Sequence, residues 1–295
     1  MAVFKYPTVF GEKRPFHGPA LHVFGALVPI SDLQRMGISW VRLSVEAPPY
    51  SDAAIDDFIH HYMGNGISIL WLMRVEAIGG VFTVPTAQAR QIAERWAYAG
   101  YSTPVFELTN EYVSSHHGHF DSEAANIEAY ITQVQAFQAD MEGYDYLVTL
   151  CNDHADYWRK FYDALLVAGR PTLEAVLAEN VIQGLHHYAP HPGAPGTIDF
   201  CEKMLQIDAV FTEGQYEAVQ CSKANCVSWL TGMYQSMGDR PWAAFASHQS
   251  GPYNEETQGY AWYDTAIPNE NGVPVLSGRT PTLMEYASAI GVILR

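Results

Sequence analysis

The sequence predicts a single α/β domain, a (β/α)8 TIM barrel that spans residues 1–295. Short β-rich runs alternate with segments of helical period from near the N-terminus to the end of the chain, the pattern of repeated βα units around a parallel sheet. Several runs, such as residues 67–73, are apolar on both faces, as strands between a core and outer helices must be. A chain of 295 residues, 48% of them hydrophobic, is long enough to bury one large core.

Eight runs along the chain are expected to form the barrel strands. They cover residues 21–27, 38–44, 67–73, 104–109, 146–150, 181–188, 209–213 and 243–247. Eight strands with about eight helices close a barrel without leaving an edge, whereas an open doubly wound sheet is the alternative fold. No glycine-rich dinucleotide fingerprint follows any of these runs, and this weighs against the open sheet.

Helix start signals stand between the expected strands. Ser51 and Asp52 cap a helix that runs to about residue 63, Pro85 opens one to about residue 99, and Ser122 opens a long one to about residue 141. Shorter helices are expected near residues 30–36, 156–167, 198–205, 222–237 and 282–294. The irregular stretch 248–279 is longer than a structural βα connection needs, so we predict a functional loop over the barrel mouth.

The charge balance narrows the choice of partners. A formal net charge of -16 argues against nucleic acid or an anionic membrane surface as a partner, and a neutral substrate fits better. No run approaches the roughly 18 apolar residues of a membrane helix. Residues 1–15 lack the apolar core of a signal peptide, although a leader removed before this sequence begins stays open. Compartment and oligomeric state cannot be inferred from the sequence.

The four cysteines lack the paired CxxC spacing of a structural zinc site. Only Cys221 and Cys226 are close in sequence. They could form a disulfide that clips the loop after a strand. Free thiols are the favoured alternative unless the protein is secreted.

Two glutamates follow apolar strands at the point where a barrel enzyme places its chemistry, the carboxyl ends of the strands. The fourth expected strand runs into Asn110 and Glu111, and the seventh ends in Glu213, which Gly214 follows. Two carboxylates that project inward from opposite sides of a barrel can flank a glycosidic oxygen and its anomeric carbon. The sequence therefore predicts a glycosidase site.

The reaction needs two carboxyl groups with different pKa values. One carboxylic acid must donate a proton to the leaving oxygen while the other carboxylate attacks the sugar carbon. Burial and a negative neighbour raise the pKa of one group, and a nearby cation keeps the other ionised. The candidate cation is Arg42, near the end of the second expected strand.

With these residues the sequence resembles the clan A glycoside hydrolases, the barrel superfamily that includes many cellulases, mannanases, xylanases and β-glycosidases. The resemblance covers most of the chain. It implies that Glu111 is the acid/base at the end of strand four, that Asn110 before it holds the sugar 2-hydroxyl, and that Glu213 is the nucleophile at the end of strand seven.

The resemblance extends to the supporting residues. Arg42 matches the second-strand arginine of the superfamily, and His186, His187 and Tyr188 match its sixth-strand His-x-Tyr, in which Tyr188 would hydrogen-bond the nucleophile. One position departs from the pattern. The tryptophan that commonly ends strand eight and forms a floor for the sugar is absent there, because Trp242 stands at the beginning of that run. His248 or an aromatic of the following loop is expected to take its place.

Structural roles are the alternatives for the charged residues. Glu111 alone would be read as a solvated loop carboxylate, and Arg42 as an ion-pair partner of Glu46 or Glu76. Glu107 shares the strand parity of Glu111 and is expected to be a paired structural carboxylate rather than a third catalyst.

Histidines and aromatic residues near the expected barrel mouth also suggest roles. A metal hypothesis is weak because the spacing of the histidines matches no metal signature; they are His116, His117, His119, His186, His187 and His191. His186 is expected to act as a neutral hydrogen-bonding group. The late aromatics could form a sugar-binding wall or simply pack on the barrel, and Trp262 is the candidate binding residue among Tyr253, Tyr260, Trp262 and Tyr263.

The leading hypothesis is a retaining glycoside hydrolase that cleaves a β-linked glycan or glycoside by double displacement, with carboxyl groups about 5 to 5.5 Å apart. Neither a cofactor nor a metal ion is expected, and the partner is a carbohydrate substrate. The alternatives are a catalytically silent carbohydrate-binding barrel and a metal-dependent barrel hydrolase. The sugar, the linkage and the choice between internal and terminal cleavage depend on loop shapes that one sequence does not fix.

Overall fold

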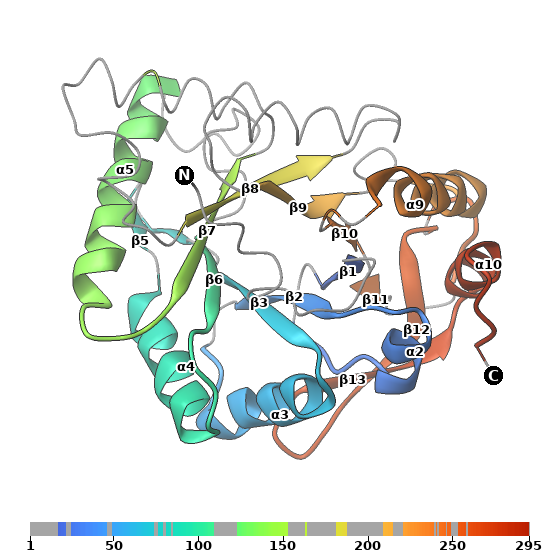
Figure 1. The fold of residues 1–295 in the computed structure, drawn as a ribbon, viewed down its shortest axis with the longest axis horizontal. Helices are drawn as coiled ribbons and strands as arrows, with labels where there is room; N and C mark the ends of the chain where they lie inside the picture. Colours follow the sequence, from blue (N-terminus) through green and yellow to red (C-terminus); the bar gives the residue numbers. More distant parts are fainter. Residues whose placement is uncertain are drawn as a thin grey trace.

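The computed structural model describes the backbone of 17–21, 25–45, 49–73, 76–78, 81–83, 85–108, 123–152, 163, 181–187, 209–214, 221–238, 240, 242–245, 247–248, 253–257 and 259–294. Eight parallel strands form a closed barrel in the order β1-β10-β9-β8-β7-β6-β3-β2 (Figure 1). They are β1 (His17–Leu21), β2 (Trp40–Val45), β3 (Ser68–Met73), β6 (Val105–Leu108), β7 (Leu147–Asn152), β8 (Val181–His187), β9 (Ala209–Gly214) and β10 (Trp242–Phe245). The predicted (β/α)8 barrel is confirmed.

The first strand was predicted in the wrong place. The run 21–27 was expected to form it, but β1 ends at Leu21. The later part of the apolar run has another role, because Leu27 forms an isolated bridge with Val275. Its N–H donates to the Pro274 carbonyl at 2.8 Å, and its own carbonyl accepts from the Leu276 N–H at 2.9 Å. The other expected strands coincide with barrel strands to within a few residues.

Helices surround the barrel (Figure 1). The described helices are α2 (Ile30–Arg35), α3 (Asp52–Tyr62), α4 (Thr86–Tyr98), α5 (Glu123–Asp140), α9 (Lys223–Met237) and α10 (Pro281–Ala289). The predicted cap at Ser51 is confirmed, because its hydroxyl accepts from the Ala54 N–H. The helix expected near 222–237 also has a side-chain cap, the Ser222 hydroxyl, which accepts from the Asn225 N–H. The predicted helices at 156–167 and 198–205 lie outside the described residues, apart from the helical Asp163.

Aromatic side chains of β3, β6 and β10 face the helices. Trp71 of β3 packs edge-on against Phe58 of α3, with ring centroids 5.9 Å apart. Phe106 of β6 packs against Phe137 of α5 at 5.9 Å, and Trp242 of β10 packs against Trp229 of α9 at 6.1 Å. Because strand side chains alternate, the residues between these positions face the barrel interior. They include Arg42, Ser44, Leu70, Leu72 and Glu107, all of them buried.

The segment after β10 is not the irregular loop that we predicted for 248–279. It contains β11 (Ser247–His248), β12 (Ala261–Pro268) and β13 (Pro274–Arg279), which form a sheet in the order β11-β12-β13. The β12–β13 hairpin turns through 269–273, where the Gly272 N–H donates to the Asn269 carbonyl and Gly272 adopts a φ of 78°. Asn271-Gly272 is a strong hairpin signal, so the correction could have been made from the sequence.

A second, shorter hairpin follows β3. It consists of β4 (Glu76–Ile78) and β5 (Val81–Thr83), which pair antiparallel. It occupies the connection between β3 and α4, at the carboxyl end of a barrel strand.

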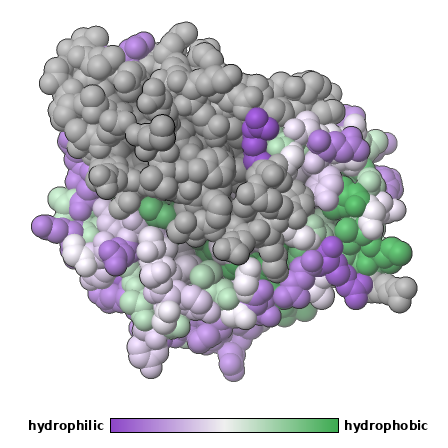
Figure 2. All heavy atoms as spheres, in the orientation of Figure 1, coloured by the Kyte–Doolittle hydropathy of each residue, from purple (hydrophilic) through white to green (hydrophobic). Residues whose placement is uncertain are grey.

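The surface of the described part carries few large apolar side chains. Figure 2 shows a mixed, largely hydrophilic surface with a green, apolar area on the right, the side on which α10 lies in Figure 1. Met284 and Ile293, 40% and 72% exposed, are the exposed large apolar residues at this end of the chain. In the described part of the chain, no helix has both the length and the apolar character that crossing a bilayer requires.

Candidate active site

Arg42 and Glu107 form a buried ion pair inside the barrel. Arg42 Nε donates to Glu107 Oε2 at 2.6 Å, and a terminal guanidinium nitrogen donates to Oε1 at 3.2 Å, so the contact is bidentate. Both side chains have no solvent exposure. The prediction that Glu107 is a paired carboxylate is confirmed, with Arg42 as a partner. The pair places a fixed cation and a fixed anion in the barrel interior.

The pair could have been inferred from strand parity. Arg42 and Glu107 are the lone ionised residues of β2 and β6, whose other residues are apolar apart from Ser44, and both occupy inward positions. A buried charge without a partner is costly, so two opposite charges in the same interior are expected to meet. Glu46 lies outside the described residues, and the side chain of Glu76, the other expected partner of Arg42, is not described.

Glu213 lies in β9, next to its last residue, and a β-bulge decides its register. Leu185 of β8 pairs with Phe211, but the next residue, His186, pairs with Glu213, so Thr212 is the extra residue of the bulge. Phe211 also pairs with the helix-facing Trp242 of β10. Without the bulge Glu213 would belong to the same alternating set of register positions as Phe211.

The bulge transfers Glu213 to the other set. Glu107 of β6 pairs with Thr149 of β7, and Cys151, two residues further, pairs with Gly184 of β8. His186 follows Gly184 by two, and Glu213 is its partner. Therefore Glu213 and His186 occupy the same alternating set of register positions as Glu107. The predicted strand-end location of these two residues is confirmed at the level of the backbone.

Three predicted site residues fall beyond the described strands. Glu111 and Asn110 follow β6, which ends at Leu108, and Tyr188 follows β8, which ends at His187. All three lie outside the described residues. The distance between the carboxyl groups of Glu111 and Glu213 therefore stays a prediction.

The two late binding candidates have different outcomes. His248 lies in β11, where its backbone pairs with that of Tyr263, and its side chain is not described. Trp262 lies in β12 with 1% exposure, and its ring is 6.0 Å from that of Tyr286 in α10. A ring buried in the core has no free face for a sugar, so the prediction of Trp262 as a binding residue is wrong.

A polar cluster that the sequence did not indicate fastens the hairpin to α2. Asp32 is buried and accepts from Tyr263 Oη at 3.0 Å, Arg279 Nε at 2.9 Å and a terminal nitrogen of Arg279 at 2.8 Å. Burial, and then the nearby Asp32 charge, raise the pKa of Tyr263 far above its usual range, so the phenol is a neutral donor. The hydrogen bond to Asp32 raises the pKa of Arg279.

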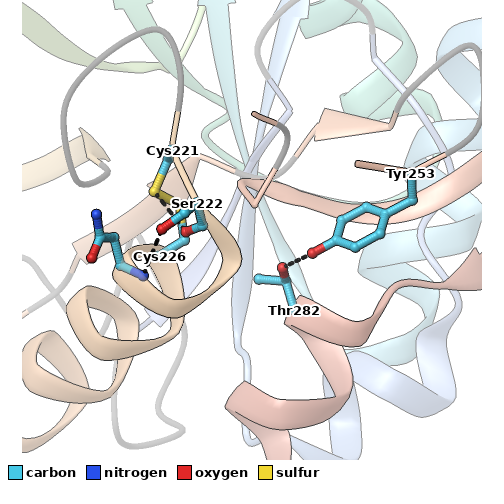
Figure 3. Close-up of a disulfide and its surroundings, with 6 residues drawn as sticks. Cys221, Ser222, Cys226, Tyr253 and Thr282 are labelled. Atoms are coloured by element: carbon cyan, nitrogen blue, oxygen red, sulfur yellow. Dashed lines mark hydrogen bonds between the residues drawn. A yellow bond between two sulfur atoms is a disulfide. The ribbon is translucent and has the colours of Figure 1, made fainter. Parts of the chain in front are cut away.

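Cys221 and Cys226 form a disulfide at the start of α9 (Figure 3). The favoured free-thiol alternative is therefore wrong. The physical reason is the helical turn that Ser222 begins, because it brings two cysteines five residues apart to a Cα separation of 6.1 Å.

The segment between β11 and β12 docks on this disulfide-linked turn. The Gly259 N–H donates to the Cys221 carbonyl at 2.7 Å, and the Lys223 N–H donates to the Glu255 carbonyl at 2.6 Å. A Cβ on Gly259 would lie 2.4 Å from the Lys223 nitrogen, so only glycine allows this approach. Nearby, the Tyr253 and Thr282 hydroxyls are 2.5 Å apart (Figure 3). These hydrogen bonds join the segment that leads from β11 to β12 to the start of α9, the helix that follows β9.

The described part of the chain contains no candidate metal site. Within those residues no group of three or more His, Cys, Asp or Glu side chains is arranged to hold a metal ion. The histidines at 116, 117, 119 and 191 lie outside them.

Comparison with known proteins adds the fold relationship. No protein-family model and no curated protein matches the chain. A fungal β-1,4-galactanase aligns with a TM-score of 0.57 and 11% identity, over 92% of this chain and 98% of its own. An endo-β-1,3-glucanase from Pseudomonas viridiflava aligns with a TM-score of 0.56 and 14% identity, over 92% of this chain and 97% of its own.

A third solved structure is that of a Saccharomyces cerevisiae Gas2p variant in complex with laminaritetraose and laminaripentaose. It has a TM-score of 0.53 and 13% identity, over 95% of this chain and 64% of its own. All three are clan A glycoside hydrolases. The chain therefore has the fold of that superfamily, as the sequence resemblance implied, and at these identities the likeness concerns the fold alone.

Proposed function

We propose that this protein is a retaining glycoside hydrolase that acts on a neutral β-linked glycan, with Glu111 as acid/base and Glu213 as nucleophile. The observation that carries the proposal is the register of the barrel. The bulge at Thr212 gives Glu213 a register position in the same alternating set as Arg42, Glu107 and His186. In barrel enzymes, the carboxyl ends of the strands supply the catalytic groups.

The proposed reaction has two steps. In the first, the Glu111 carboxylic acid gives its proton to the glycosidic oxygen while a Glu213 carboxylate oxygen bonds to the anomeric carbon and the bond to the leaving group breaks. In the second, Glu111 takes a proton from water, the water oxygen bonds to the anomeric carbon, and Glu213 leaves as a carboxylate. The buried Arg42 supplies positive charge in the same interior, which favours the ionised form of the nucleophile.

The substrate class is inferred from charge and from the fold relatives. A net charge of -16 disfavours acidic polysaccharides, which the protein would repel. The relatives named above are a β-1,4-galactanase, an endo-β-1,3-glucanase and a protein crystallised with laminarin oligosaccharides. We propose neutral β-glucans and β-galactans as the first substrates to test.

The test compares the wild type with Glu111→Gln and Glu213→Gln on a panel of neutral β-glycans and aryl β-glycosides. Each substitution is isosteric and removes one carboxyl group, so we expect each to lower kcat/KM by at least about a thousandfold. Proton NMR of the first product formed should show the β-anomer, because double displacement retains configuration.

An inhibitor separates the proposal from its alternative, a barrel that binds carbohydrate without cleaving it. A 2-fluoroglycoside should add one glycosyl group to Glu213 of the wild type and none to Glu213→Gln, as intact-mass spectrometry would detect. Oligosaccharide binding without turnover or labelling would favour the silent barrel. Unchanged turnover in both glutamine variants would remove the site assignment altogether.

A further inference from the structure

The Arg42–Glu107 pair bridges two strands that are not neighbours. In the barrel β3 lies between β2 and β6, with Leu70 opposite Arg42 and Leu72 opposite Glu107. Leu70 and Leu72 are buried and belong to the inward set, so the two charged side chains meet over an apolar surface. The contact is therefore built across the barrel interior and not along a strand.

We propose that Glu107 is a positioning residue, which fixes the Arg42 guanidinium in a single orientation beside the reaction centre. The proposal rests on the proposed function, which assigns the reacting carboxyl groups to Glu111 and Glu213. Glu107 itself touches no reacting atom in this scheme and acts through Arg42.

Stability alone does not account for such a pair. Removing two charges from water costs several kcal/mol per ion, and apolar residues of similar volume often replace a buried pair without loss of stability. The interior around the pair is already apolar, as Leu70 and Leu72 show. A fixed, dry cation is instead what a site that develops and discharges carboxylate charge requires.

An arginine near two glutamates needs a further anchor. Glu213 is negative before the reaction and becomes a neutral ester in the intermediate, so an arginine bound only to it would lose its partner during each turnover. The planar Arg42 guanidinium donates two hydrogen bonds to Glu107, at 2.6 and 3.2 Å, and these hold it throughout. Glu107 also cancels most of the Arg42 charge, and this limits how far the pKa of each reacting glutamate is lowered.

The ionisable neighbours of the pair follow from the register. Within the described strands, β3 and β10 carry none, and the positions that share the alternating set of the pair are those of Cys151, His186 and Glu213. His17 of β1 pairs with Trp242 and His187 of β8 pairs with Gly214, so both belong to the opposite set. Glu111, proposed as acid/base, follows β6 outside the described residues.

The experiment compares the wild type, Glu107→Gln and Glu107→Asp in the full-length protein. The glutamine variant keeps the shape and removes the charge. The aspartate variant keeps the charge and is one methylene too short for the bidentate contact. Thermal and urea unfolding report the folded fraction of each, and Glu213→Gln on the same substrate establishes that the turnover measured is that of the proposed site.

For Glu107→Gln we expect kcat to fall about a hundredfold per folded molecule with KM changed by less than about threefold, the effect of a displaced catalytic arrangement. Both limbs of the pH profile should move to lower pH by about one unit, because an uncompensated Arg42 charge favours the carboxylates. For Glu107→Asp we expect a similar loss of kcat with the pH limbs unmoved. A purely structural carboxylate would lower the folded fraction and leave both quantities as in the wild type.

A second readout does not depend on hydrolysis. In protein with 15N-labelled arginine, the Arg42 Nε–H should exchange slowly with solvent in the wild type and at least about tenfold faster in Glu107→Gln, since a buried charged hydrogen bond protects it. Equal exchange in the two proteins, or a wild-type pH profile and kcat in folded Glu107→Gln, overturns the positioning role. Absence of turnover in the wild type itself overturns the proposed function instead, and the exchange comparison then decides whether Glu107 anchors Arg42.

Discussion

Fully buried ionised side chains in the described part of this protein have partners that match their geometry. Arg42 meets Glu107 through two nitrogens, and Asp32 accepts from Tyr263 and from two nitrogens of Arg279. The two clusters differ in setting. The first has no exposure on either side chain, whereas Arg279 keeps 28% of its side chain exposed. The first is enclosed inside the barrel and is the one that we connect to catalysis.

Trp262 provides the residue-scale prediction, because its burial replaces the binding role that the sequence suggested. Trp262→Ala removes a ring that is 1% exposed and packs on Tyr286, so we expect the free energy of unfolding to fall by about 3–5 kcal/mol. Urea unfolding measures this change. Affinity for a glycan, measured on the folded fraction, should be unchanged.

The matched control is Tyr98→Ala, which removes an aromatic ring that is 81% exposed. Tyr98 lies under the Arg95 guanidinium at 4.7 Å, so its loss should cost no more than about 1 kcal/mol. If Trp262→Ala were as stable as the wild type but bound glycans weakly, Trp262 would belong to a binding wall after all.

At the scale of elements, the bulge in β9 gives Glu213 a register position that a regular strand would not give it. A strictly alternating β9 would give Glu213 the register parity of Phe211, which pairs with the helix-facing Trp242. The bulge at Thr212 changes that parity at the last possible residue before Glu213. Bulges near active sites commonly re-aim a strand in this way.

Deletion of Thr212 tests the element. Removing the extra residue places Glu213 directly after Phe211, so regular alternation still pairs it with His186 and keeps its register parity. We therefore expect kcat/KM to stay within about tenfold of the wild type, with the barrel signal in far-ultraviolet circular dichroism retained. Thr212→Val, which keeps the length and the bulge, is the control and should stay within about tenfold of the wild type. A folded deletion variant that has lost its activity would contradict this, because it would show that Glu213 depends on the bulge itself and not on its register parity alone.

Local signals explain which elements could be predicted. Ser51 predicted the start of its helix correctly, because a side-chain cap is a short-range interaction that the sequence contains in full. The run 21–27 was wrongly predicted as the first strand. Its last residue, Leu27, pairs instead with Val275, nearly 250 residues away. Pairing over such a separation depends on the whole fold, so a pattern along the chain does not identify it.

The same distinction applies to the site at the scale of the whole molecule. The strand-end location of Glu213 and the pairing of Glu107 followed from parity and from the number of strands. Neither the bulge at Thr212 nor the Asp32–Arg279 contact could be predicted, because each depends on how distant segments meet in space. The disulfide was partly predictable. The sequence shows that Cys221 and Cys226 are close, but it does not show whether the two thiols are oxidised.

The β12–β13 hairpin raises a question about the whole molecule, namely whether it is a lid or part of the fold. It is attached at two places. Arg279 and Tyr263 bind Asp32 of α2, and Asn269 and Asn271 both donate to Asp57 of α3 at 2.8 Å. Leu27 bridges Val275 as well. An element held by side chains of two barrel helices and by backbone hydrogen bonds is expected to unfold together with the barrel.

Asp32→Asn tests this unity. The substitution keeps the shape but leaves Arg279 without its carboxylate, and because that arginine is partly exposed we expect a loss of about 2–3 kcal/mol, below the cost of breaking a fully buried pair. Asp264→Asn, at an exposed position of the same hairpin, is the matched control and should change stability by less than about 0.5 kcal/mol.

In the wild type the hydrogen-bonded amides of β12 and β13 should exchange with solvent as slowly as those of β2 and β3. In Asp32→Asn the hairpin amides should exchange faster while the β2 and β3 amides follow only the global loss of stability. Fast amide exchange of the hairpin already in the wild type would identify it as a mobile lid. The segment 248–279 would then move as the predicted functional loop over the barrel mouth, although it contains β-strands.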